Sequence, residues 1–360
     1  MKRVLLVIEG ALDDSGVPNV VMHTVRGLRG QYRFDVLCRA TQPGSFDREF
    51  AGYGGTVYRM ALPDYNVHPL LFLLRPLLLR RKLKALFRAN AYDVVHCHSG
   101  FEAGLIAQIA ARHHVPVRIA HAHGTYQTKR KNPLLTAYNR WNRKQIEKNC
   151  TAKLACSGVA GETLYLNRTF WNILNPVDLS FYGNVEKIPH TGIHLLQIGY
   201  FSPVKNQLFT LQVVQELKRR GKAVTVAFLG YCRGQGYYRQ MMQFISKHGL
   251  EEQVLFYPRN ADKVQLLGWA DLVLLPSSRE GLPLVSLEAQ AGKTRCLLSD
   301  RVPREADRGA AVFLPYNDLE QWTEAIASGD FSAVVDGQRL NAVGLPSYLE
   351  HIRRAYEGMQ

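Results

Sequence analysis

The chain has 360 residues, of which 46% are hydrophobic, so it can bury a sizeable core and is long enough for two domains. This composition excludes an intrinsically disordered protein. Lysine and arginine exceed aspartate and glutamate by 15, which favours a polyanionic partner such as nucleic acid, anionic lipid or a phosphate-bearing substrate.

The first residues predict a strand rather than an export signal. Only five apolar residues separate the initial cations from Glu9, too few for the core of a signal peptide. The longest apolar stretch, which begins at Leu70, is interrupted by Arg75 and Pro76 and falls below the ~20 residues of a membrane span. The six cysteines show no close pairs of metal-ligand spacing, so we expect reduced thiols in a cytoplasmic protein.

Apolar, β-branched runs alternate with helix-length segments in the first half of the chain, which is typical of a parallel sheet covered on both faces. The rhythm breaks after Asn175, where residues 176–191 contain two prolines and no clear period and predict a linker. The predicted strands before this linker are residues 3–8, 34–40, 56–62, 93–99, 117–123, 152–157 and 169–175.

A second alternating series follows the linker and predicts a second domain. We therefore expect an α/β protein of two doubly wound domains, residues 1–178 and 190–344, whose ligands bind outside the carboxyl ends of the strands. The strands predicted in the second domain are residues 193–199, 223–230, 253–258, 271–277, 294–300 and 310–315.

The segment REGLPLVSLEAQAG, residues 279–292, holds two carboxylates eight positions apart. Pro283 suits the first position of a helix, so a helix is predicted from Pro283 to Gly292. The free amides at its start and the helix dipole favour an anion there. Glu280 precedes these amides, and Glu288 lies roughly 7 Å further along at ~1.5 Å per residue.

A nucleoside diphosphate sugar has its parts in the matching order, namely a hydroxyl-rich sugar, a diphosphate and a ribose diol. Carboxylates accept hydrogen bonds from vicinal hydroxyls, and backbone amides donate to phosphate oxygens. From spacing alone an alternative remains open, in which Glu280 is a loop charge and Glu288 a solvated helix residue.

The motif EGLPLVSLE resembles the E-x7-E motif of retaining glycosyltransferases of the GT-B fold, particularly the large family four, and the resemblance covers nearly the whole chain. Within that family, capsule and exopolysaccharide transferases are the most similar group. Further motifs appear in the family's order: DVVHCH and RIAHAHGT resemble its two His-bearing strand ends, CSGVAGETL its serine-containing strand exit, NPVDLSFY its linker, and IGYFSPVKN its Gly-Arg-x4-Lys-Asn phosphate loop.

The resemblance implies two Rossmann-like domains that face a deep interdomain cleft, with the acceptor on the first domain and the nucleotide sugar on the second. It also implies a last helix, at about 345–360, that packs back on the first domain. In the donor site, Glu280 would hold the sugar hydroxyls and Glu288 the ribose. The implied donor-binding residues are Gly16, Gly199, Tyr200, Lys205, Asn206, Gly230, Arg259, Glu280, Gly281, Pro283, Leu284, Val285 and Glu288.

Three residues are expected to act in catalysis, namely Glu280, Lys205 and His123. Cleavage of the sugar–phosphate bond builds negative charge on the diphosphate, which the Lys205 ammonium would stabilise most strongly in the transition state. A neutral imidazole at His123 can donate to a sugar hydroxyl or accept the acceptor's proton. The alternatives are a solvated lysine at a helix start and a structural histidine.

A zinc site is a further alternative for the histidines, because His96 with His98, and His121 with His123, each place two imidazoles on one strand face. No carboxylate accompanies them at ligand spacing, so we expect neither a metal nor another cofactor.

Two departures from the family pattern affect expected ligand contacts. The second glycine of the usual pair is missing after Gly16, which weakens the expected acceptor contact there. Tyr200 stands where an arginine is common, so the phosphate charge would be met by Lys205 alone or by Lys205 with Arg259.

Basic residues are concentrated in the predicted first domain. Six cations and no acid lie between Arg75 and Arg88 among many leucines, and residues 129–153 add eight cations against Glu147 alone. Such segments are typical of an anionic membrane surface, and the alternative is a solvated helix packed on its own domain. We see no nucleic-acid recognition motif and no aromatic platform.

The sequence therefore predicts a retaining glycosyltransferase of the hexosyltransferase type that is peripheral on the inner face of the cell membrane. Residues 70–90 and 129–153 would contact the membrane. The donor is expected to be a UDP-sugar and the acceptor a polyprenyl-diphosphate-linked saccharide in capsule or exopolysaccharide synthesis. The alternatives are a non-catalytic nucleotide-sugar-binding scaffold and a nucleotide-sugar epimerase on the same fold.

Overall fold

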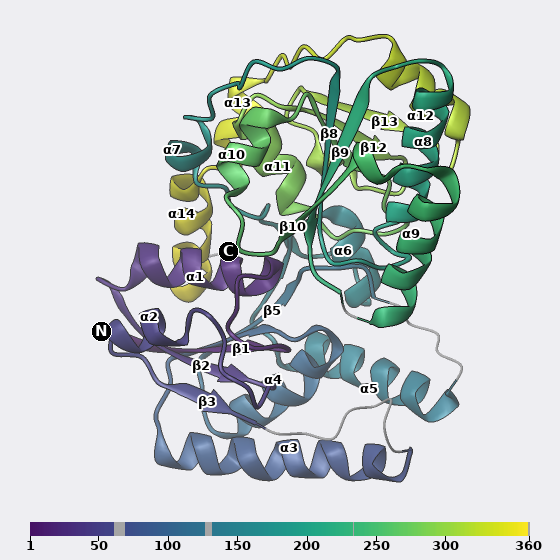
Figure 1. Cartoon of the computed structure of the whole chain (residues 1–360). Helices are drawn as coiled ribbons and strands as arrows, with labels where there is room; N and C mark the ends of the chain where they lie inside the picture. Colours follow the sequence, from purple (N-terminus) through teal and green to yellow (C-terminus); the bar gives the residue numbers. More distant parts are fainter. Residues whose placement is uncertain (61–68, 127–131, 233, 359–360) are drawn as a thin grey trace. The chain divides into compact units, whose positions relative to one another are not determined.

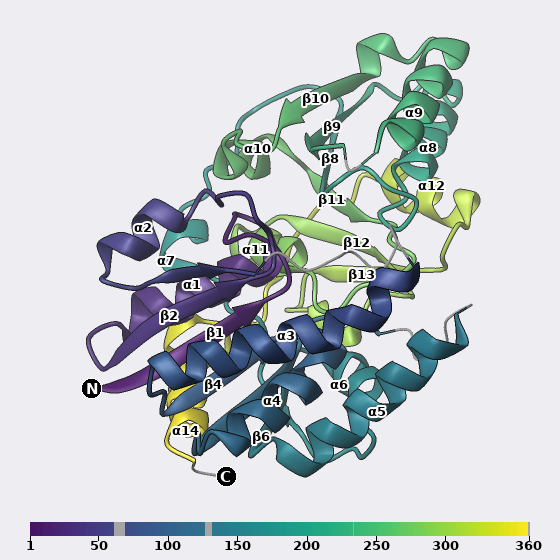
Figure 2. The same cartoon turned by 90° about the horizontal axis from the view of Figure 1, so that it is seen from below.

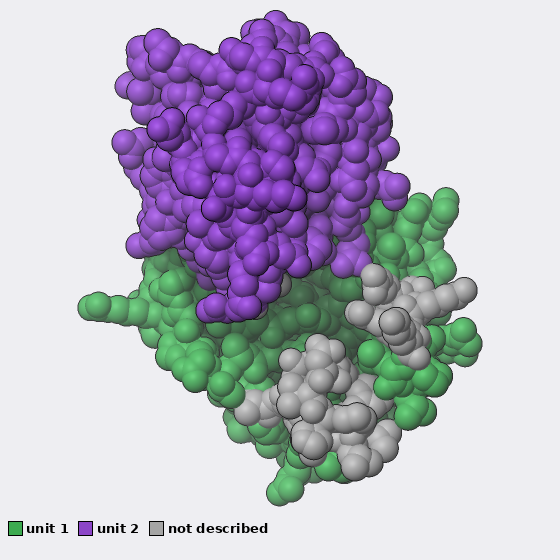
Figure 3. Space-filling model, turned by 45° about the vertical axis from the view of Figure 1, so that its right-hand side comes forward, with its two compact units in different colours: residues 1–176, 345–360 green, residues 177–344 purple. Residues whose placement is uncertain are grey.

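The computed structural model describes residues 1–60, 69–126, 132–232 and 234–358. The chain divides into two compact units, of which unit 1 comprises residues 1–176 and 345–360 and unit 2 comprises residues 177–344 (Figures 1 and 3). Each unit is built around one parallel sheet with helices packed against it. The prediction of an α/β protein with two doubly wound, Rossmann-like domains is confirmed.

The sheet of unit 1 has the strand order β3-β2-β1-β4-β5-β6-β7, so its direction of growth reverses between β1 and β4. The central strand β1 is apolar and buried over Val4–Ile8 because helices cover both faces of the sheet. The strands are β1 (Lys2–Ile8), β2 (Tyr32–Cys38), β3 (Val57–Arg59), β4 (Val94–His98), β5 (Val117–Ala122), β6 (Ala152–Ala155) and β7 (Trp171–Asn172).

Three helices of unit 1, α3, α4 and α5, lie side by side on one face of its sheet (Figure 2). The middle helix α4 can approach α5 closely because Gly104 has no side chain, and a Cβ there would lie 2.2 Å from the Asn142 carbonyl oxygen. The helices in this part of the chain are α1 (Gly16–Leu28), α2 (Asp47–Gly52), α3 (Pro69–Ala89), α4 (Ala103–Arg112), α5 (Pro133–Asn149) and α6 (Gly158–Leu164), with a 3-10 turn at Gly100–Glu102.

The last helix, α14 (Leu345–Tyr356), belongs to unit 1 and packs on α1. The Tyr348 hydroxyl lies 2.9 Å from Thr24 Oγ1, and the Tyr356 hydroxyl lies 3.0 Å from His96 Nδ1. Both tyrosines are almost completely buried. The helix is therefore part of the core of unit 1.

The sheet of unit 2 has the strand order β10-β9-β8-β11-β12-β13, and its direction of growth reverses between β8 and β11. Its core includes Phe209 and Trp322, whose rings meet edge to face. The strands are β8 (Ile193–Ile198), β9 (Val224–Gly230), β10 (Val254–Pro258), β11 (Leu272–Leu275), β12 (Arg295–Ser299) and β13 (Ala311–Leu314). The helices are α7 (Leu179–Tyr182), α8 (Gln207–Arg219), α9 (Gln235–His248), α10 (Lys263–Trp269), α11 (Leu284–Ala291), α12 (Leu319–Ala327) and α13 (Gly337–Asn341).

Three local features differ from the sequence-based expectation. The strand predicted over 169–175 is paired only at Trp171–Asn172, at the edge of the sheet. The predicted linker contains the short helix α7, whose first amides bond to the Asp178 side chain. Pro283 stands just before helix α11 rather than inside it, so the helix begins at Leu284.

Within the described part of the chain, none of the helices is both long enough and apolar enough to span a bilayer.

We expect Tyr356→Ala to destabilise unit 1 by about 3–5 kcal/mol, as for other large buried aromatic side chains. Hydrogen exchange in increasing urea, followed on peptides from β1 and β4, measures this loss, and β8 peptides report unit 2 separately. Arg354→Ala, at an exposed position of the same helix, should change stability by less than about 0.5 kcal/mol. Equal effects of the two substitutions would show that α14 is not part of the core of unit 1.

Candidate functional site

Two loops meet at the carboxyl edge of the sheet in unit 2, at the point where its direction of growth reverses. One loop follows β8 and the other follows β11, and these strands are neighbours. The Ser278 amide donates to the Val204 carbonyl oxygen at 2.9 Å and ties the two loops together. In open parallel sheets such a reversal point is the usual place for a ligand.

Each loop contributes one member of an ion pair, because Lys205 Nζ lies 2.6 Å from Glu280 Oε1. Both side chains are largely buried, with 17% and 11% of their surface exposed. Gly199 has a φ of +149°, and a Cβ there would lie 3.3 Å from the Lys205 stem. A glycine at this position therefore leaves room for the lysine.

Buried polar side chains fix the main chain of Lys205. Gln197 Nε2 donates to the Lys205 carbonyl oxygen at 2.7 Å, and Thr210 Oγ1 donates to Gln197 Oε1 at 2.8 Å. Asn206 follows in the left-handed conformation, with φ +61°, and its side-chain amide donates to the Pro276 carbonyl oxygen at 3.2 Å. These contacts fix the backbone from which the Lys205 side chain extends.

The start of α11 provides backbone donors beside this ion pair. Gly281, Leu282 and Pro283 are buried, and Pro283 offers no side-chain cap to the helix. The amides of Leu284 and Val285 belong to the first turn, where a helix has no carbonyl partner for its N–H groups. An anion at this end would receive both backbone hydrogen bonds and the favourable helix dipole.

The second carboxylate of the motif, Glu288, is buried one turn further along α11 and is also paired. Lys263 Nζ lies 3.0 and 2.9 Å from its two oxygens and 3.2 Å from the Tyr182 hydroxyl. Neither Lys263 nor Tyr182 was predicted as a site residue from the sequence. Tyr182 ends the NPVDLSFY motif, whereas no sequence signal marks Lys263, which lies 25 positions before its partner.

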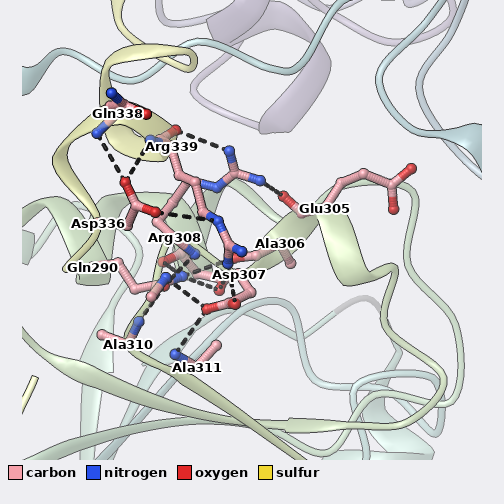
Figure 4. Close-up of polar contacts among 12 residues, drawn as sticks. Gln290, Glu305, Ala306, Asp307, Arg308, Ala310, Ala311, Asp336, Gln338 and Arg339 are labelled. Atoms are coloured by element: carbon pink, nitrogen blue, oxygen red, sulfur yellow. Dashed lines mark hydrogen bonds and ion pairs between the residues drawn. The ribbon is translucent and has the colours of Figure 1, made fainter. Parts of the chain in front are cut away.

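Gln290, near the end of α11, is completely buried and hydrogen-bonds to the backbone of the segment before β13 (Figure 4). Its Nε2 donates to the Ala306 carbonyl oxygen at 2.7 Å, and its Oε1 accepts from the amides of Arg308 at 2.6 Å and Ala310 at 3.2 Å. One side chain thus ties the helix to the segment that leads into β13, which fixes the helix relative to the sheet.

That segment is held in turn by charged residues near α13 (Figure 4). Arg308 donates to the Arg339 carbonyl oxygen at 2.9 Å, and burial lowers the pKa of its guanidinium. Asp307 accepts from the amide of Gly309 at 2.8 Å and pairs with the Arg339 guanidinium at 3.1 Å. These contacts support α11 from the side away from its first turn.

The other predicted donor residues lie at neighbouring strand ends. Tyr200 follows Gly199, and Lys205 Nζ lies 5.9 Å from the centre of its ring. At Gly230 a Cβ would lie 2.1 Å from the Gly199 carbonyl oxygen, so the loops after β8 and β9 pass in close contact. The Arg259 guanidinium lies 4.9 Å from the centre of the Tyr231 ring. Gly16 differs from all of these because it belongs to unit 1, as the first residue of α1.

The four histidines predicted at strand ends of unit 1 form two hydrogen-bonded pairs across β4 and β5. His96 Nε2 lies 3.2 Å from His121 Nδ1, and His98 Nδ1 lies 2.7 Å from His123 Nε2. Burial lowers the pKa of His96 to about 3 and that of His123 to about 4. It also lowers the pKa of His98 and His121 well below the ordinary range. All four imidazoles are therefore neutral at pH 7.

Three of these imidazoles could hold a metal ion, since nitrogens of His96, His98 and His121 all lie within 4.8 Å of one another. Three histidines are a known ligand set for zinc. A metal would replace the hydrogen bond between His96 and His121, and this group offers it no carboxylate. Metal independence stays a prediction.

An ion network that was not predicted from the sequence lies at the 3-10 turn that follows β4. Glu102 Oε1 accepts from Arg75 Nε at 2.8 Å, and Glu102 Oε2 lies 3.2 Å from the Arg39 guanidinium, which also lies 3.7 Å from Glu9. The Arg75 side chain is 1% exposed. Arg75 was counted among the cations of a membrane-binding face, and this was wrong because it is buried against Glu102.

The remaining basic residues of α3 and α5 are mostly exposed. On α3, Arg81 and Arg88 accompany Leu74 and Leu77, which are 48% and 63% exposed. On α5, the exposed cations are Arg140, Lys144 and Lys148. Two cations of this segment have partners within unit 1, because Arg143 donates to the Leu164 carbonyl oxygen and Lys153 pairs with Glu147. Residues 129–131 and the side chains of residues 70–73 lie outside the described residues.

Comparison with known proteins shows two family matches along the chain. Residues 15–162 match the glycosyl transferase 4-like domain, and residues 181–327 match the glycosyl transferases group 1 domain. Among solved structures, that of HepE from Anabaena in complex with UDP superposes with a TM-score of 0.80 at 15% identity, and the match covers 100% of both chains.

Three curated proteins are similar in sequence. The putative glycosyltransferase EpsF of Bacillus subtilis is 28% identical over 91% of this chain and 87% of its own length. The capsular polysaccharide biosynthesis glycosyltransferase CapH of Staphylococcus aureus is 26% identical over 74% and 73%. The UDP-Gal:alpha-D-GlcNAc-diphosphoundecaprenol alpha-1,3-galactosyltransferase of Escherichia coli is 26% identical over 68% of each chain.

The neutral histidines make the stability of unit 1 depend on pH. Burial lowers the pKa of His123 from 6.5 to about 4, so between these values the unfolded chain binds the additional proton. Unit 1 should therefore lose stability as the pH falls below 6.5, by about 1.4 kcal/mol per pH unit for each such histidine. Hydrogen exchange in urea, followed on β4 and β5 peptides at several pH values, measures the slope.

The variant His123→Asn should reduce this slope by about 1.4 kcal/mol per pH unit, because one titrating group is removed. His351→Asn, at an exposed position of α14, is the matched control and should leave the slope unchanged. An unchanged slope in His123→Asn would contradict the neutral state of His123.

Proposed function

The chain belongs to the GT-B glycosyltransferases, with a glycosyl transferase 4-like domain followed by a group 1 domain, and we propose that it transfers a hexose from a UDP-sugar with retention of configuration. The observation that carries this proposal is the pairing of Lys205 with Glu280 at 2.6 Å beside the first turn of α11. In this proposal the cation and the helix amides bind the diphosphate, and the carboxylate binds the hydroxyls of the sugar.

In this proposal the diphosphate binds at the first turn of α11, with the Lys205 ammonium against its oxygens. Glu280 accepts hydrogen bonds from the hydroxyls of the sugar, and Glu288 accepts them from the ribose. Negative charge grows on the diphosphate as the sugar–phosphate bond breaks, and a fixed ammonium stabilises this charge without reorganising. Tyr200 takes the place of a second cation, so the phosphate charge is met by Lys205 alone or by Lys205 with Arg259.

Retention is proposed to follow from attack on the same face of the sugar from which the diphosphate departs. A double displacement needs a carboxylate free to act as the nucleophile. Glu280 and Glu288 are instead each bound to a lysine, at 2.6 and 2.9 Å. His123, which is neutral at pH 7, would contact the sugar or the acceptor hydroxyl. We propose that the reaction needs no metal.

The acceptor is proposed to be a saccharide on a polyprenyl diphosphate lipid in capsule or exopolysaccharide synthesis. Support comes from the Escherichia coli relative, whose acceptor by name is a sugar on diphosphoundecaprenol, and from CapH, which is named for capsular polysaccharide biosynthesis. Exposed leucines and cations on α3 and exposed cations on α5 suit a surface that holds such a lipid. The protein would then act at the inner face of the cell membrane.

We expect Lys205→Ala and Glu280→Ala each to lower the transfer rate at least about a hundredfold, which is the usual cost of removing one group that stabilises transition-state charge. Release of UDP from a UDP-sugar, with and without acceptor, measures the rate. Lys247→Ala is the matched control because that lysine is exposed and distant in sequence from both loops.

Near-normal rates in both variants would contradict the assigned roles. Binding of donor without transfer or hydrolysis in the unmodified protein would favour a non-catalytic scaffold, and an isomerised donor without acceptor would favour an epimerase. The anomeric configuration of the product, determined by NMR, tests retention, and the rate after treatment with EDTA tests metal independence.

Membrane attachment should depend on the basic face of α3. Arg81→Glu combined with Arg88→Glu should weaken binding to vesicles that contain anionic lipid by about tenfold or more, since each juxtamembrane cation contributes about 1 kcal/mol. Cosedimentation with anionic and with neutral vesicles at two salt concentrations measures the loss. The pair Arg239→Glu and Lys247→Glu carries the same change in charge on exposed residues of α9 and is the control. Equal losses in both pairs would show that the net charge, rather than α3, causes attachment.

A further inference from the structure

Lys263 occupies a position that is unfavourable for a cation by itself. It is the first residue of α10, and the preceding Asp262 caps this helix by accepting from the amides of Val264 and Gln265. The amino end of a helix carries partial positive charge, so a lysine there is repelled by the helix dipole. A residue that breaks a local rule needs a compensating contact elsewhere in the fold.

The compensating contact is the carboxylate of Glu288. Lys263 Nζ lies 3.0 Å from one carboxylate oxygen and 2.9 Å from the other, so a single ammonium bridges both. The Glu288 side chain is 12% exposed and that of Lys263 is 32% exposed. A buried carboxylate without a partner is costly, and the lysine removes this cost while it fixes the plane of the carboxylate.

Tyr182 completes the arrangement from a third element. It ends helix α7, which packs on α11, and its hydroxyl lies 3.2 Å from Lys263 Nζ. Burial and the neighbouring Glu288 carboxylate raise the pKa of Tyr182, so its hydroxyl stays protonated. Its oxygen can accept from the ammonium and thereby orient it toward Glu288.

We propose that Lys263 and Tyr182 are positioning residues that hold Glu288 for a vicinal diol and thereby make the site selective for ribonucleotides over 2′-deoxyribonucleotides. An ionised carboxylate has about four acceptor positions. Lys263 takes one on each oxygen, and the Tyr182 hydroxyl also hydrogen-bonds to this carboxylate. The remaining acceptor capacity of Glu288 is left for the hydroxyls of a ribose. This inference rests on the proposed function, in which Glu288 faces the ribose of the donor.

A fixed carboxylate discriminates better than a mobile one. A ligand that lacks one hydroxyl leaves an acceptor of the buried carboxylate without its hydrogen bond, whereas a mobile carboxylate can turn to satisfy itself elsewhere. Loss of Lys263 should therefore reduce the advantage of the ribonucleotide rather than weaken every ligand equally. A purely structural contact between α7, α10 and α11 would instead affect both ligands and the melting temperature alike.

The test compares binding of UDP, GDP and ADP with binding of their 2′-deoxy counterparts by isothermal titration calorimetry. For the base that binds most tightly, the unmodified protein should prefer the ribonucleotide by about tenfold or more, the usual range for a hydrogen bond to a charged group. Lys263→Met should reduce this preference to less than about threefold and should raise KM for the donor while kcat changes little. Tyr182→Phe should have a smaller effect in the same direction.

Two controls accompany the variants. Lys263→Arg retains the charge and should restore much of the preference, and Lys247→Met should behave as the unmodified protein. An unchanged preference in Lys263→Met, or an equal loss for both forms of the nucleotide, overturns the role of Lys263 alone. Failure of the unmodified protein to bind any of the nucleotides overturns the proposed function, and this inference with it.

Discussion

The proposed donor site depends on one constraint, the parallel pairing of β8 with β11. Parallel neighbours end at the same edge of a sheet, so the loops that follow them must meet there. Lys205 and Glu280 are 75 positions apart in the chain, yet this pairing places their charged atoms 2.6 Å apart. The hydrogen bond from Ser278 to Val204 then fixes the distance between the loops, so the ion pair does not have to hold them together by itself.

The helix that follows β11 serves two purposes, and its two sides show this division. Its first turn and Glu288 carry the groups assigned to the donor, while the completely buried Gln290 binds three backbone groups of the segment before β13. Because these hydrogen bonds of Gln290 attach the helix to the neighbouring segment, the helix has one defined orientation. A defined orientation is what an electrostatic site requires. Arg308 and Asp307 support this orientation through their contacts with the segment before β13 and with α13.

Much of the fold could be predicted because strands buried on both faces are continuous apolar runs, and the strands of the described residues overlap the predicted runs, although β7 covers only Trp171–Asn172. The motif residues could be predicted because their spacing within one loop is local. The partners of Glu288 could not be predicted, since Lys263 comes from another helix and only the packing of α7, α10 and α11 brings them together.

The histidine pairs also depended on register, because β4 pairs His96 with Ile119 and so places His121 at hydrogen-bonding distance. The prediction that Arg75 belongs to an exposed basic face was wrong because a contact between segments decides its burial. Its partner Glu102 lies on a different segment.

The return of α14 to unit 1 determines the order in which the polypeptide can complete its two halves during synthesis. Residues 177–344 form a continuous stretch that leaves the ribosome with all of its own strands and helices. The other half lacks the buried Tyr348 and Tyr356 until α14 has been synthesised, so His96 has no contact with Tyr356 before then. Nascent chains stalled before residue 345 would thus carry a finished second half attached to an incomplete first half, in which α1 lacks the helix that packs on it.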